Sequence, residues 1–141
     1  PKLAAVLLPT IAGVICGTIA YCLPLTLGDG GVQLGSIAQH GKNIGVDMLL
    51  WTAFAKIICL SVSLGFGHIG GQIFPTIFIG TCVGRALSIQ WPDVFPLMLS
   101  LPCMMIAVPC AFAPIPFSLC MMVESSLVLG NKMAAPIFLC C

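Results

Sequence analysis

A chain of 141 residues in which 60% of the side chains are hydrophobic and 6% are charged cannot cover a soluble surface, because soluble domains carry about 25% charged residues. Five basic and four acidic residues give a net charge of +1, which excludes a nucleic-acid-binding protein, since that class needs a basic surface. The mean hydropathy of +1.17 indicates an all-α, multi-pass membrane protein.

The first half of the chain predicts two membrane-spanning helices. Residues 3–27 form an apolar run long enough to cross a bilayer, which needs about 20 residues, and a glycine-rich turn at residues 28–31 ends it. Residues 32–39 predict a short helix, and residues 40–43 predict a polar loop. Residues 46–64 predict the second span.

Small residues occur throughout these apolar runs. Gly13 and Gly17 form a G-x-x-x-G pattern, which lets two helix backbones approach closely in lipid. All nine cysteines lie in apolar runs and show neither C-x-x-C pairs nor partner histidines. We therefore interpret the cysteines as small buried hydrophobic residues, not as disulfides or metal ligands.

The second half predicts one further helix and then shorter pieces. Residues 65–71 interrupt the second span, and a helix is expected from residue 72 or 73 to about residue 87. From residue 93 onward, several prolines predict broken or kinked helices in place of full spans. Glu124 lies in the last of these pieces. Three charged residues are expected at the membrane interface: Arg85, Asp93 and Lys132.

The glycine-rich segment at residues 65–71 has four glycines in seven residues and precedes a helix with Pro75 in its first turn. The N–H groups of a first turn have no acceptor within the helix, and with the positive end of the helix dipole they make an anion site. Inside a bilayer they must meet protein, water or a bound anion. The alternative is a tight turn in which glycine only permits close packing.

The residues from Lys56 to Gly84 resemble the CLC family of chloride channels and chloride/proton antiporters. The family signature K-x8-G-x-G-x-x-G-G-x-F-x-P-x-L-x-x-G-x-x-x-G is matched in spacing without a gap. Ile73 replaces the phenylalanine of the signature, and Gln72 fills a variable place. Because the family contacts its anion through backbone N–H groups, this replacement need not abolish binding.

The resemblance implies a chloride-transporting protein with no catalytic residue, no metal and no cofactor, in which chloride is the transported ligand. It implies that helix-terminal amides, chiefly those of Gln72 and Ile73, face the anion. It also implies a homodimer in the lipid bilayer and leaves open a voltage-gated channel or a proton-coupled antiporter. The anion-binding segment would comprise Gly70, Gly71, Gln72, Ile73 and Pro75.

The first-half family motifs G-S-G-x-P and G-x-E-G-P do not occur. We therefore interpret residues 1–141 as a partial CLC-type transmembrane domain, a single domain truncated at both ends. It would supply one wall of an anion site and need the missing first half of the same transporter as its partner. The alternative is a structural or degenerate membrane fragment without transport activity. An enzyme is not expected, because neither G-x-S-x-G nor H-E-x-x-H occurs.

Two charged residues inside apolar segments have open roles. Lys56 matches the signature lysine, which would lend positive potential or structural pairing near the pathway, or it is a lysine that reaches toward the end of its span. Glu124 follows a segment that loosely resembles the family's R-A-P-L-T helix start. It is either a proton or ion relay or a carboxylate satisfied by backbone or serine groups.

Overall fold

The computed structural model describes residues 2–68, 70–113 and 116–127. These residues form helices and no strand, which confirms the all-α prediction. Two helices, α3 and α4, are long and apolar enough to cross a membrane. The elements are α1 (Lys2–Cys22), the 3-10 helix η1 (Pro24–Thr26), α2 (Gly31–Ile44), α3 (Val46–Gly65), α4 (Ile73–Gln90), α5 (Leu97–Phe112) and α6 (Pro116–Leu127).

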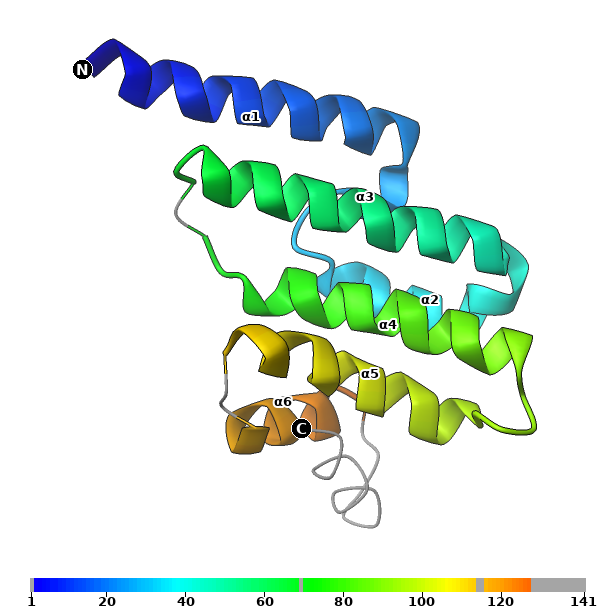
Figure 1. The fold of residues 1–141 in the computed structure, drawn as a ribbon. Helices are drawn as coiled ribbons and strands as arrows, with labels where there is room; N and C mark the ends of the chain where they lie inside the picture. The colour runs from blue at the N-terminus through cyan, green and yellow to red at the C-terminus, as the bar shows by residue number, and fades with distance from the viewer. Residues whose placement is uncertain (1, 69, 114–115, 128–141) are drawn as a thin grey trace.

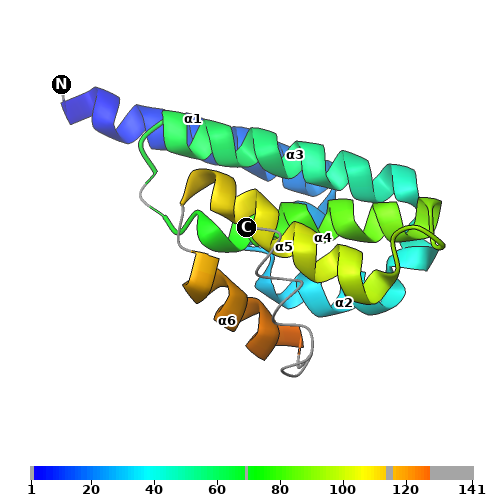
Figure 2. The same ribbon diagram turned by 60° about the horizontal axis from the view of Figure 1, so that its bottom comes forward.

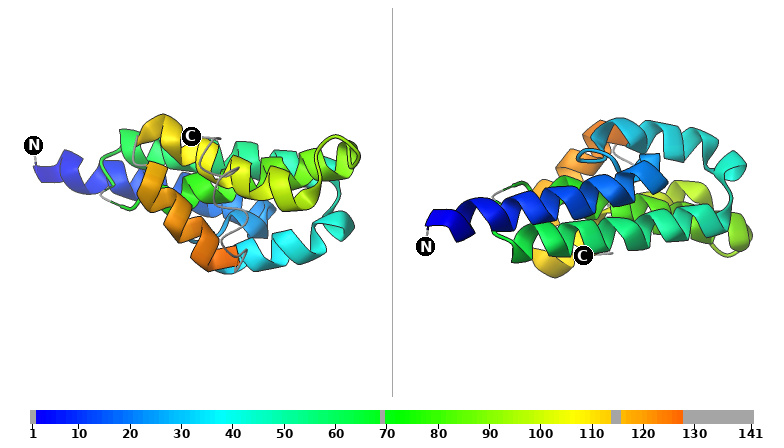
Figure 3. Two further views of the ribbon diagram at one scale, coloured as in Figure 1. Left: turned by 90° about the horizontal axis from the view of Figure 1, so that it is seen from below. Right: turned by 90° about the horizontal axis from the view of Figure 1, so that it is seen from above.

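Four helices, α1, α3, α4 and α5, lie side by side in that order, as Figure 1 shows. The helix α2 packs behind α4, and α6 packs against α5 (Figures 1 and 2). Views from below and above show α2 and α6 on the same side of this row of helices (Figure 3). The centre of the described structure is therefore α4, which contacts α2, α3 and α5.

The burial of α4 follows from its sequence, in which most side chains are apolar or small. Phe78 and Ile79 belong to a hydrophobic cluster with α2 and α3, and Ile77 belongs to a second cluster with α5 and α6. Gly80 and Gly84 face α5. A Cβ atom on Gly80 would collide with the backbone carbonyl of Met104, so the absence of a side chain sets the distance between the two helices.

The first helix is shorter than predicted. It ends at Cys22, and residues 24–26 form η1, whereas the apolar run extends to residue 27. Pro24 explains the difference, because a proline disfavours helical geometry in the residue before it. Gly13 and Gly17 do not mediate a helix contact among the described residues, since a Cβ atom on either would meet nothing within 4 Å.

The prediction of a polar loop at residues 40–43 is wrong, because these residues form the last turn of α2. The helix ends at Ile44, and its C-cap residue Gly45 has a φ of 86°. Gly41 is buried against the side chain of Arg85, and a Cβ atom there would lie 2.6 Å from Arg85 Nε. The polar neighbours of Gly41 remain exposed. Because Gly41 has no side chain, this turn of α2 can pack against Arg85, and the polar segment stays helical.

Arg85, which the sequence predicts as an interfacial charge, lies buried between helices. Its side chain is only 4% exposed, and its Nε atom has no hydrogen-bond partner among the described residues. The charge lies where α2 crosses α4, and Gly41 provides the space for it. The sequence could not show this, because residues 41 and 85 meet only in the folded chain.

The prolines at positions 102 and 109 do not break the helix that contains them. Pro102 and Pro109 are both buried inside α5, which continues as one helix of 16 residues. Each proline removes one backbone hydrogen bond, a loss that packing against neighbouring helices can compensate in membrane proteins. The helices α5 and α6, of 16 and 12 residues, are shorter than the roughly 20 residues of a full span, as predicted. Pro114 and Lys132 lie outside the described residues.

Candidate anion-binding site

The chain after α3 has a defined backbone path at residues 66–68. The N–H group of His68 donates a hydrogen bond to Ser63 O at 2.9 Å, and Gly67 N donates to Leu64 O at 3.1 Å. Gly67 has a φ of 82°, a left-handed conformation that glycine adopts without strain. These bonds end α3 and turn the chain toward the start of α4.

The backbone donors at the start of α4 have no partner among the described residues. Gln72 is the N-cap residue and makes no side-chain capping hydrogen bond. The N–H groups of Gly71, Gln72, Ile73 and Phe74 have no acceptor in the part of the chain that the structure describes, and Pro75 has no N–H group at all. The helix dipole adds a partial positive charge of about half a proton at this end.

A cavity of about 360 Å³ lies beside this helix start. Cβ atoms built on Gly70 or Gly71 would meet no other atom within 4 Å, so these two glycines leave space open. The cavity is lined by Cys16, Gly17, Ala20, Thr26, Leu27, Gly28, Lys56, Cys59, Leu60, Ser63, Leu64, His68, Gly70, Gly71, Gln72 and Pro75.

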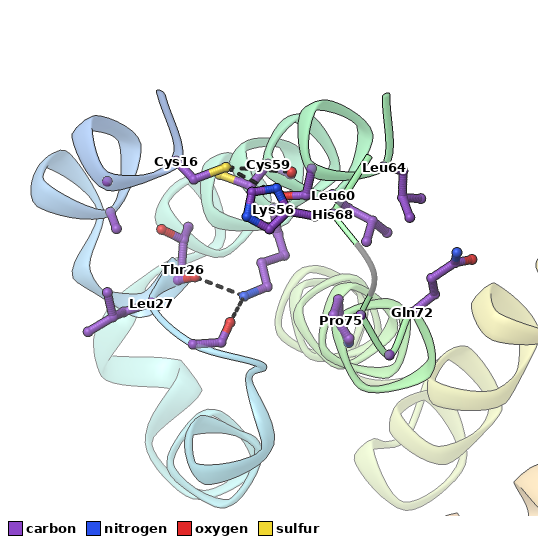
Figure 4. Close-up of a pocket in the computed structure, with 16 residues that line it drawn as sticks. Cys16, Thr26, Leu27, Lys56, Cys59, Leu60, Leu64, His68, Gln72 and Pro75 are labelled. Carbon is purple, nitrogen blue, oxygen red and sulfur yellow. Dashed lines mark hydrogen bonds between the residues drawn. The ribbon is translucent and has the colours of Figure 1, made fainter. Parts of the chain in front are cut away.

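Lys56 brings a positive charge to the same cavity. Its side chain is 4% exposed, and Nζ donates hydrogen bonds to Thr26 O at 2.8 Å and to Gly28 O (Figure 4). Nζ also lies 5.4 Å from the centre of the Phe78 ring. An ammonium group has three N–H donors, so two hold the turn after α1 and the third has no acceptor among the described residues.

The Lys56 ammonium and the N–H groups at the start of α4 line the same cavity, and this arrangement favours an anion. The family model described as voltage gated chloride channel matches residues 1–141. The chain belongs to the CLC family. It is 32% identical over 91 residues to the H(+)/Cl(-) exchange transporter ClcA of Klebsiella pneumoniae (strain 342), a match that covers 64% of this chain and 19% of that relative. No solved structure gives a significant match.

Membership of the CLC family confirms the resemblance and makes this chain an integral membrane protein. Gly70, Gly71, Gln72 and Pro75 all line the cavity of this CLC chain. Ile73 does not line it, because its side chain packs toward the hydrophobic cluster between α4, α5 and α6. The side chain of Gln72 points away from the Lys56 ammonium (Figure 4), so only the backbone of this residue can share a ligand with Lys56.

The two charged candidates of the CLC chain lie in different places. Lys56 bonds to backbone carbonyls of the turn after α1 and does not extend along its helix toward the end of the span. Glu124 lies in α6, and none of the residues that line the cavity comes from α6. Its side chain is outside what the structure describes.

We did not predict from the sequence that α1 and α3 form the cavity walls opposite the start of α4. Cys16 of α1 donates a hydrogen bond to Cys59 O at 3.6 Å, and its sulfur lies 3.6 Å from Ser63 Oγ of α3. Cys59 and Ser63 follow Lys56 by three and seven residues, which places all three on one helix face. That spacing is a signal available in the sequence. No comparable signal joins α1 or the turn after it to this face.

Proposed function

We propose that this chain forms one wall of a chloride pathway in a multi-pass CLC channel or chloride/proton exchanger. Chloride is held by the backbone N–H groups at the start of α4, without covalent chemistry or a cofactor. The observation that carries the proposal is that the uncapped start of α4 and the Lys56 ammonium face one cavity. The relative from Klebsiella pneumoniae is named as a proton/chloride exchanger, which agrees with this proposal.

Backbone amides suit a site that must release its ion. Each N–H group offers a partial charge, so several together attract chloride without the strength of a direct ion pair. Conduction needs binding that is favourable enough to admit the ion and weak enough to let it leave. The surrounding apolar protein strengthens such weak dipoles, because the local dielectric constant is lower than that of water.

Lys56 supports this site in two ways. Its two hydrogen bonds fix the turn at Thr26 and Gly28 against α3, which holds one wall of the cavity in place. Its charge raises the electrostatic potential in the cavity, and the third N–H group has no acceptor among the described residues. Because the same cavity is lined by Lys56 and by the start of α4, this charge adds to the attraction of the amides for an anion.

The chain matches 19% of the length of its curated relative, so the complete pathway is part of the proposal. We propose that the first half of the same transporter supplies the opposite wall and that the whole protein is a homodimer in the lipid bilayer. The signature residues that this chain contains would then contribute the amide side of each pore.

The test is chloride efflux from liposomes that contain the full-length protein, with Gly71→Leu as the variant. A Cβ atom at Gly71 meets open space, so the leucine side chain fills the cavity and not a packed interface. We expect efflux to fall by about tenfold or more, which corresponds to about 1.4 kcal/mol or more.

The matched control is Gly13→Leu, at an exposed position of α1 that also meets open space but does not line the cavity. We expect this control to transport chloride at the unmodified rate. Unchanged efflux in Gly71→Leu would refute the anion site. An unmodified protein that transports no faster than empty liposomes would support the non-transporting alternative.

A further inference from the structure

Phe78 contacts the Lys56 ammonium but does not itself line the cavity. Its side chain is fully buried, and Lys56 Nζ lies over its ring, 5.4 Å from the ring centre. A cation within about 6 Å of a ring centre is attracted by the negative face of the ring. Phe78 belongs to α4 and follows Pro75 by three residues. The ring therefore links the helix that offers its amides to the cavity with the charge on α3.

The position of the Phe78 ring depends on a glycine in the turn before α2. Gly30 is the N-cap residue of α2 and has a φ of 95°. A Cβ atom on Gly30 would lie 2.8 Å from the Cβ, Cγ and Cδ2 atoms of Phe78, so the ring occupies the space that a side chain at residue 30 would need. Two residues earlier in this turn, the carbonyl of Gly28 accepts a hydrogen bond from Lys56. The same turn thus contacts both the ring and the ammonium.

The partners of the ammonium leave its charge uncancelled. Among the described residues, Lys56 contacts two neutral backbone carbonyls of this turn and the ring of Phe78, and it forms no ion pair with a carboxylate. The carboxylate of Asp29 accepts a hydrogen bond from Gly31 N at 3.0 Å instead. Carbonyl dipoles and a ring face stabilise a buried cation without neutralising it, so one full positive charge remains beside the cavity.

We propose that Phe78 is a positioning residue of the anion site, whose ring holds the Lys56 ammonium beside the cavity so that its charge acts on chloride. This inference rests on the proposed function, because the charge acts at the same cavity. A ring with a weaker negative face holds the ammonium less firmly, and the potential at the start of α4 then falls. We expect chloride efflux to decrease about fivefold, which corresponds to the strength of one cation–π contact.

The experiment replaces Phe78 in the full-length protein by phenylalanines with one, two or three fluorine atoms on the ring. Fluorine withdraws electrons from the ring face and changes the ring shape little, so a residue that only fills space would tolerate it. We expect efflux from liposomes to fall stepwise and to reach about the fivefold decrease with three fluorines. The control places the same residues at Phe54, an exposed ring on α3 that does not line the cavity, and should transport at the unmodified rate.

A second measurement tests whether the ring acts through Lys56 and does not depend on chloride. The fluorinated series is made again in Lys56→Met, and unfolding in denaturant is measured for both series. With Lys56 present, each added fluorine should lower the stability relative to the same step in Lys56→Met, because only the first series contains an ammonium over the ring. The comparison between the two series removes any effect of fluorine on packing alone.

The outcomes separate the role of Phe78 from the proposed function. Efflux that is independent of fluorine at residue 78 would overturn the role of Phe78 and leave the anion site intact. Equal stability changes with and without Lys56 would overturn it as well. An unmodified protein that transports no chloride would overturn both proposals. A stepwise loss of efflux at Phe78 that is absent at Phe54, together with stability changes that require Lys56, would support the inference.

Discussion

Two pairs of glycines in one short stretch of the CLC signature have opposite roles in packing. Gly80 and Gly84 are buried in the middle of α4, where a Cβ atom would collide with the backbone of α5. Gly70 and Gly71 come just before the same helix, where a Cβ atom would meet nothing within 4 Å. The first pair permits close helix packing, and the second pair keeps a space open beside backbone donors that have no acceptor in the described part of the chain.

The difference decides between two interpretations of the glycine-rich loop. If glycine served only close packing there, the positions of missing side chains would be occupied by neighbouring atoms, as they are at Gly80 and Gly84. The space at Gly70 and Gly71 is instead part of the cavity. Close packing therefore explains Gly80 and Gly84, but it does not explain Gly70 and Gly71.

The strongest way to test the packing half of this comparison is Gly80→Ala. The added methyl group would point at the carbonyl of Met104, and backbone atoms cannot move aside as a flexible side chain can. We expect the full-length protein in detergent to lose about 3 kcal/mol of stability, in the upper part of the range for overpacked sites. Thermal unfolding checks this, and a melting temperature equal to that of the unmodified protein would show that α4 and α5 are not held at this distance.

The sequence predicted the second span and the start of the helix after it well. The predicted second span at residues 46–64 differs from α3 by one residue, and the start of α4 is as expected. Its end is three residues later, at Gln90, because no proline or glycine stops the helix before Pro92. These boundaries depend on local chain chemistry, which a single sequence contains.

The cavity was only partly predictable from the sequence. The wall at the start of α4, which includes Gly70, Gly71 and Pro75, could be predicted from the glycine-rich loop and from the proline that follows it. The opposite wall brings Cys16 to Cys59 and Thr26 to Lys56, across 43 and 30 residues of chain, and only tertiary packing brings them together. The G-x-x-x-G patterns that begin at Gly13 and at Gly80 show the same limit, since they look alike in the sequence but the one at Gly13 contacts no neighbouring helix among the described residues.

A smaller effect is expected for Lys56→Met, which tests how the far wall of the cavity is held. The change keeps an unbranched side chain but removes both hydrogen bonds to the turn, leaving the carbonyls of Thr26 and Gly28 without these donors. We expect a loss of about 2 kcal/mol in unfolding free energy, since a buried unsatisfied acceptor costs about 1–3 kcal/mol and burial of the charge is no longer required.

Unfolding in denaturant, together with chloride efflux from liposomes, measures this change. The control Lys42→Met removes an exposed charge from α2 and should alter neither quantity. A Lys56→Met protein with unchanged stability would show that the turn is held by other contacts.

The smallest effect is expected for Gly71→Ala, the same substitution as Gly80→Ala at the open glycine pair. Gly71 is not among the glycines with positive φ, so alanine can adopt its backbone conformation, and the new methyl group enters the cavity without a clash. We expect the stability to change by no more than about 0.5 kcal/mol, as for substitutions that touch no packed group. Thermal unfolding beside Gly80→Ala gives the comparison directly. A loss at Gly71 as large as the loss at Gly80 would mean that the loop glycines are packed in the complete protein, and the space proposed for chloride would then be filled by other parts of the transporter.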